Sequence, residues 1–127
     1  MAALTDYLEG KLLDHSLRIA SFTMPPALYV ALYTTATTDA GGGTEVVGGS
    51  YARQVLTMGA GSAANERSNS ISAIFPNMPG VTVSHAAILD ALTVGNMLYH
   101  GALTTPVVMV AGNAFAFNIG DIDVQLT

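Results

Sequence analysis

The chain has 127 residues, which is the length of one ordinary domain and argues against a two-domain enzyme. Half of the residues are hydrophobic but only 10% are charged, whereas an average soluble domain carries about 25% charged residues. The formal net charge of -5 argues against nucleic-acid binding, which needs clustered Lys and Arg. A surface so poor in charge is suited to burial against neighbouring proteins.

Cysteine is absent from the sequence, which excludes disulfides, thiolate metal sites and thiol nucleophiles. Residues 1–8 contain no basic segment, and Asp6 and Glu9 interrupt any apolar stretch, so we expect an unprocessed product made in the cytoplasm. Residues 19–38 and 91–120 are uncharged, but both contain proline. Because a spanning helix needs about 20 mostly apolar residues without such breaks, we expect no membrane span.

Residues 5–20 predict one amphipathic helix. Thr5 or Asp6 is placed to cap its first turn, and the prolines at 25 and 26 end the helical pattern. An apolar stripe on such a helix must dock on the domain's own sheet or on a neighbouring subunit. The residues on this stripe are Leu8, Leu12, His15 and Ile19, widened by Leu13 and Leu17.

The rest of the chain predicts short β-strands separated by turns. Their spacing of roughly 8–12 residues is typical of a sandwich or small barrel. Two pairs predict hairpins: 85–92 with 96–103, and 107–110 with 114–119. We therefore expect a mainly β protein, an antiparallel and jelly-roll-like β-sandwich over residues 28–127, within a single domain of residues 1–127. The other expected strands are 28–35, 51–58, 71–75, 81–83 and one from 122 to 126.

Two polar and glycine-rich segments separate these strands. Residues 36–50 form a long loop, and loops beyond about 12–15 residues are usually functional or ordered by a partner. Residues 59–70 predict a second loop of small and polar residues. The glycines of these segments precede no Gly-Lys-Ser/Thr ending, so we expect flexible loops and no phosphate site.

The polar residues predict no catalytic or metal centre. His15, His85 and His100 lack the spacing of a metal-binding pair, and we expect ordinary hydrogen bonds for the two later histidines. Asp121 and Asp123 share one face of the last strand, where they either bind Ca²⁺ or, as we favour, protect a solvated edge. No Gly-x-Ser-x-Gly motif is present. We therefore expect no enzymatic activity, no cofactor and no metal.

Arg53 shares a strand face with Tyr51 and Val55. Arg and Tyr together are typical of protein interfaces. The alternative is a pair within the chain, between Arg53 and Glu45 or another carboxylate of the loop. The sequence leaves these two interpretations open.

Several strings, taken together, resemble a family of small tailed-phage virion proteins that are commonly named tail fibre proteins. The resemblance runs in order through nearly the whole chain. It implies a structural protein of the virion. The strings are LTDYLE at 4–9, KLLDH at 11–15, LYVALYTT at 28–35, GGGTEV at 41–46, GGSYARQ at 48–54 and LYHGALT at 98–104.

A fibre subunit usually has a long shaft or repeats, and this compact chain has neither. We therefore expect a capsid cement, or decoration, protein that stabilises contacts between capsid subunits. The alternative is a tail fibre or baseplate-associated protein that takes part in receptor binding. The expected location is the virion, at the capsid surface or else the tail, after synthesis in the host cytoplasm.

The partners implied are further copies of the chain, as a trimer, and the major capsid protein; in the alternative they are other tail proteins. Neither nucleic acid nor membrane is expected as a partner. The segments expected to form the interfaces are the N-terminal helix and the loop around Glu45 to Arg53. The residues are Leu8, Leu12, His15, Glu45, Tyr51 and Arg53.

Overall fold

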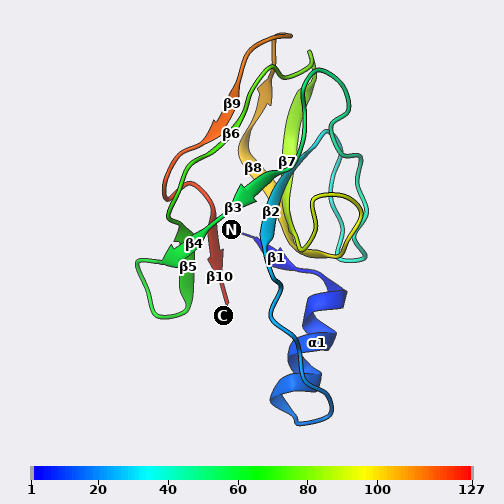
Figure 1. Cartoon of the computed structure of the whole chain (residues 1–127), viewed down its shortest axis with the longest axis vertical. Coiled ribbons are helices and arrows are strands. Elements are labelled where there is room, and N and C mark those ends of the chain that lie inside the picture. The colour runs from blue at the N-terminus through cyan, green and yellow to red at the C-terminus, as the bar shows by residue number, and fades with distance from the viewer. Residues whose placement is uncertain (1, 127) are drawn as a thin grey trace.

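The computed structural model describes residues 2–126 and is mainly β. All strand pairs are antiparallel, and one short helix lies near the N-terminus, so the predicted fold class is confirmed (Figure 1). Among these residues no helix is long and apolar enough to cross a membrane. The strands are β1 Ala3–Leu4, β2 Leu28–Tyr33, β3 Gln54–Leu56, β4 Met58–Ala60, β5 Glu66–Asn69, β6 Ala73–Phe75, β7 Thr82–Leu89, β8 Met97–Val108, β9 Phe115–Phe117 and β10 Asp123–Gln125.

The largest sheet has five strands in the order β1-β8-β7-β2-β3. β7 and β8 form the predicted hairpin. β7 begins and ends three residues earlier than expected, so that it includes most of the strand expected at 81–83, and β8 is longer than expected because it continues to Val108. The register shifts between Val83 and His85, so that residues 103–106 of β8 bulge out opposite Ser84. Pro106 lies in this bulge, where its missing N–H breaks no ladder hydrogen bond.

Two smaller sheets complete the fold, with the orders β10-β5-β4 and β6-β9. The predicted hairpin of 107–110 with 114–119 is wrong, because β8 continues to Val108 and β9 pairs with β6. The predicted loop at 59–70 is also wrong in part, since it contains β5, which pairs with both β4 and β10. The expected strand at 51–58 is divided between β3 and β4.

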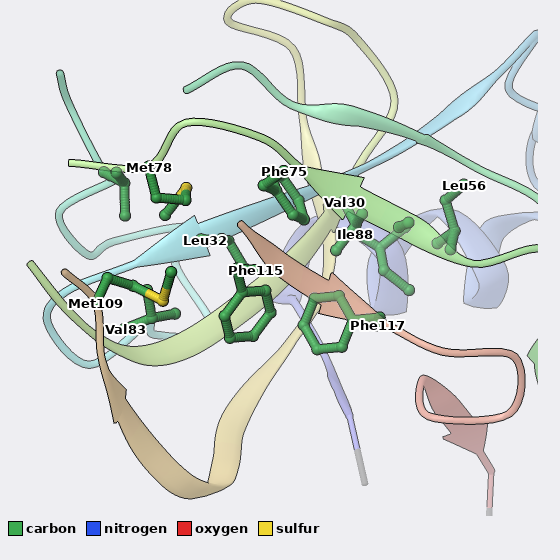
Figure 2. Close-up of a cluster of buried hydrophobic side chains, with 12 residues drawn as sticks. Val30, Leu32, Leu56, Phe75, Met78, Val83, Ile88, Met109, Phe115 and Phe117 are labelled. Atoms are coloured by element: carbon green, nitrogen blue, oxygen red, sulfur yellow. The ribbon is translucent and has the colours of Figure 1, made fainter. Parts of the chain in front are cut away.

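The main core lies between the five-stranded sheet and the β6-β9 pair. Phe75 is fully buried and contacts Phe115 and Phe117 edge to face, with ring centroids 6.2 and 6.4 Å apart. Successive side chains of β2 point to opposite faces of the sheet, and those of Val30 and Leu32 point toward these rings. Figure 2 shows these side chains gathered in one cluster with those of Ile88 and Met78. A smaller buried cluster covers the other face of the sheet.

Helix α1, Asp6–Ser16, is shorter than the predicted 5–20. The Thr5 side chain caps its start by accepting a hydrogen bond from Leu8 N, and its hydroxyl donates to the Met97 carbonyl. The helix ends because Arg18 adopts a left-handed conformation, with φ 62°, and the Ile19 N–H turns back to the Asp14 carbonyl. Figure 1 shows α1 and the segment after it projecting beyond the strands.

Candidate functional site

The projecting segment of residues 10–24, here called the arm, consists of the second half of α1 and the turn after it. Its turn is held closed because the Phe22 N–H donates to His15 Nδ1 over 3.1 Å. The predicted docking stripe divides here: Leu8 is buried and Leu12 half-buried, whereas His15 is exposed. Four larger apolar side chains of the arm face solvent, and their exposed fractions are 58% for Leu13, 65% for Leu17, 72% for Ile19 and 82% for Met24.

Glu45, Tyr51 and Arg53 meet in one cluster within the chain. Arg53 Nη2 lies 2.9 Å from Glu45 Oε1, and Arg53 Nε donates to Glu45 Oε2 over 3.0 Å. The Tyr51 hydroxyl donates to Glu45 Oε2 over 2.7 Å. The intramolecular alternative considered for Arg53 is therefore confirmed, and the role of these residues at an interface stays a prediction.

This cluster fixes the long glycine-rich loop. Glu45 forms a bridge with Tyr33 at the end of β2, and Arg53 Nη1 donates to the carbonyls of Ala91 and Val94 in the β7-β8 turn. Hydrogen bonding to Glu45 raises the pKa of Arg53, and burial raises the pKa of the Tyr51 phenol. Arg53 is thus a half-buried structural cation, and four of its five N–H donors are used within the chain.

The other polar residues have ordinary structural roles. His85 hydrogen-bonds with Ser84, and His100 bonds with Thr37 Oγ1 and Asp39 Oδ1, as expected for both histidines. Asp121 precedes β10 and accepts from the Asn118 N–H, so it lies in a turn and does not share the strand with Asp123. The expected shared strand face is therefore wrong. Among residues 2–126 no three His, Asp or Glu side chains cluster as a metal site would require.

A shallow apolar groove lies where β8 passes the segment that leads into β10. Tyr99 and Leu103 line it from β8, and Phe117 and Ile122 line it from the facing segment. Asp121 and Asp123 place two carboxylates at the same groove. Sequence reasoning missed this groove, because its two sides are brought together by pairings that no local pattern reveals.

The comparison with known families decides the assignment. Residues 3–125 match the model of the family described as podophage GP4 fiber I protein gp80. The chain belongs to this family. No curated protein matches the sequence.

Membership in the fiber I protein family confirms the prediction of a phage virion structural protein. The match spans both the arm and the sandwich, so the arm is part of the family domain. Exposed apolar side chains gathered on one projection, as on the arm, are typical of protein interaction sites.

Proposed function

We propose that this protein is a structural subunit of the podophage tail fibre assembly, and that it works by binding neighbouring virion proteins without catalysis. The family description supports the fibre. The observation that carries the binding role is the arm, which leaves Leu17, Ile19 and Met24 mostly exposed. A domain that exposes such side chains together on one projection gains free energy when a partner covers them.

The partner that fits the arm best is a second copy of the chain. Each copy carries both the apolar arm and the apolar groove between β8 and the segment leading into β10. Arg18 is exposed on the arm, and Asp121 and Asp123 lie at the groove, so the charges are complementary. Because arm and groove are different surfaces, the contact is head-to-tail, and such contacts form a ring when the rotation between copies closes. We propose a ring of three copies.

Light scattering on the purified chain tests this assembly. We expect a trimer for the unaltered protein and the 13.1 kDa monomer for the variant Leu17→Ser/Met24→Ser. Val108→Ser is the control, because Val108 is 76% exposed on β8 outside the arm, and it should remain trimeric. A monomeric unaltered protein, or equal dissociation of both variants, would overturn the arm-to-groove assembly.

Capsid cement is the second candidate function. It is favoured by the low charge of the chain, 10% of residues, and by a compact sandwich, both of which suit burial at junctions of a shell. Many weak contacts repeated around a shell would stabilise the particle, because cement binds only the assembled state. The Gly-rich loop and α1 would then also contact the major capsid protein.

A cryo-electron map of the intact virion separates the two functions. We expect density of this fold at the tail. Density at the symmetry positions of the capsid, with none at the tail, would replace the fibre assignment by cement. In that case particles that lack the protein should be more fragile on heating.

Nucleic acid is not proposed as a partner in either function. Of the four basic residues, Arg53 is paired with Glu45, and Arg67 donates to the carbonyls of Ala64 and Glu66. Lys11 and Arg18 remain on the arm, and two cations cannot form the basic surface that phosphate backbones require.

A further inference from the structure

A polar pocket of about 360 Å³ lies on the face of the five-stranded sheet that is turned away from the main core. Its walls come from the start of α1, the loop after β2 and the β7-β8 turn. The volume is within the range of small-molecule sites, roughly 300–1,000 Å³. The polar and aromatic residues that line it are Thr5, Asp6, Tyr7, Tyr33, Asp39, Arg53 and Asn96.

Tyr33 is the residue that points to a ligand. Only 5% of its surface is exposed, yet its hydroxyl has no hydrogen-bond partner among residues 2–126, whereas the equally polar Tyr51 hydroxyl has two. Every fully buried side-chain oxygen or nitrogen in these residues has a partner, so the Tyr33 hydroxyl reaches solvent through the pocket that its side chain lines. The Tyr33 hydroxyl is therefore accessible to a hydrogen bond with a molecule that occupies the pocket.

The protonation of Tyr33 suits hydrogen bonding to a neutral ligand. Burial raises its pKa, and the nearby Glu45 carboxylate raises it further. The phenol is therefore neutral at physiological pH and can both donate and accept.

The charged groups of the pocket select against anions. The Arg53 guanidinium is occupied by Glu45 and by the carbonyls of Ala91 and Val94. Asp39 Oδ1 accepts a hydrogen bond from His100 Nε2, and Asp39 Oδ2 takes no part in that bond. Asp6 adds a second carboxylate to the pocket. The pocket thus offers carboxylate acceptors, while four of the five N–H groups of Arg53, the cation that lines it, are already used within the chain.

Carboxylates, a phenol and an aromatic rim together suit a polyhydroxylated ligand. Sugar hydroxyls donate strong hydrogen bonds to ionised carboxylates. Tyr7, which is 37% exposed, supplies an aromatic surface with which the C–H groups of a sugar ring can pack. Lys11 lies 5.7 Å from the centroid of that ring and is not one of the lining residues.

We propose that this pocket binds one neutral sugar unit, with Tyr33, Asp6 and Asp39 as its hydrogen-bonding residues. This function goes beyond the proposed assembly role and uses a different surface from the arm. A neutral sugar is available both as a free saccharide and as a unit of a cell-surface polysaccharide, and the experiment distinguishes these sources.

Calorimetric titration of the full chain tests the proposal. The probes are glucose, galactose, mannose and N-acetylglucosamine, with glucuronic acid as the anionic control, followed by purified neutral polysaccharide from a host surface. We expect saturable binding of at least one neutral sugar and none of glucuronic acid. Binding of the polysaccharide at much lower concentration than its own monosaccharide would identify the surface polymer as the source; equal affinity per sugar unit would identify the free sugar.

Two conservative variants locate the binding. Tyr33→Phe retains the ring and should weaken binding about 5- to 10-fold, as expected for one lost hydrogen bond. Tyr29→Phe, on the same strand but not among the lining residues, should leave affinity unchanged. Asp39→Asn should weaken binding similarly to Tyr33→Phe. The proposal is overturned if no neutral sugar binds, if glucuronic acid binds best, or if the two tyrosine variants behave alike. None of these outcomes alters the light-scattering test of assembly.

Discussion

The guanidinium of Arg53 and the carboxylate of Glu45 make a two-point contact, with Nη2 2.9 Å from Oε1 and Nε 3.0 Å from Oε2. The Arg53 side chain is only 9% exposed and that of Glu45 26%. This contact ties the glycine-rich loop to the β7-β8 turn, because Arg53 also donates to the Ala91 and Val94 carbonyls.

Arg53→Met should lower the free energy of unfolding by about 2–3 kcal/mol, since it leaves a partly buried carboxylate without its cation. Urea denaturation measures the change. The matched control is Arg67→Met, because Arg67 is exposed and donates to nearby carbonyls; its effect should stay below about 0.5 kcal/mol. Equal losses for the two variants would show that the Glu45 contact contributes nothing to stability.

Tyr51→Phe should lower the free energy of unfolding by about 1–2 kcal/mol. The change removes the hydrogen bonds with Leu32 N and Glu45, while the ring still stacks on Phe75 with centroids 5.8 Å apart. Tyr7→Phe is the control, because Tyr7 is at the surface. The idea is refuted if the two variants unfold at the same urea concentration.

Tyr51 should also make stability depend on alkaline pH. Burial raises its pKa above the ordinary 10.0, so the folded state binds its proton more tightly than the unfolded chain does. The resulting stabilisation is fully present below the unfolded pKa and is lost as the pH rises through the folded value. Denaturation at a series of alkaline pH values should therefore show a shallower decline for Tyr51→Phe than for the unaltered protein, and an identical decline would contradict this assignment.

Asn69→Leu should destabilise the protein by about 3 kcal/mol, because it leaves buried backbone groups unpaired. The Asn69 amide donates to the carbonyls of Ile71 and Asn118, and its Oδ1 accepts from the Ile122 N–H. Asn65→Ala is the control; its amide bonds to Leu126 at the surface, and its effect should be below about 1 kcal/mol. Denaturant midpoints compare the two, and a control loss as large as that of Asn69→Leu would count against the argument.

Replacing either of two glycines by alanine should change the stability of the protein, in opposite directions for the two positions. Gly10 lies inside α1 with open space around a built Cβ, so Gly10→Ala should stabilise the protein by up to about 1 kcal/mol. Gly49 has φ 56°, and its Cβ would lie 2.5 Å from the Asn77 carbonyl oxygen; Gly49→Ala should therefore cost about 1–3 kcal/mol. Thermal melting measures both changes, and shifts of the same sign would contradict this account.

Local patterns in the sequence correctly predicted the features that depend on near neighbours. Thr5 caps the helix as expected, β2 follows the alternation of residues 28–33, and β7 and β8 form the expected hairpin. The sequence predicted that Leu13 and Leu17 widen the apolar stripe of the helix. It did not predict which side chains of that stripe are exposed.

The sequence by itself determined the mainly β class, the start of the helix and the strands with clear alternation, because these follow from the periodicity of apolar side chains. The tertiary structure decided which strands pair. Phe115 and Phe117 reach the core beside Phe75 only when β9 pairs with β6, and the polar segment 66–69 becomes a strand because two neighbours satisfy its backbone. It also brought Tyr33, Asp39 and Asp6 to one pocket. Such contacts join residues that are far apart in the chain, so the pattern of neighbouring residues in the sequence does not predict them.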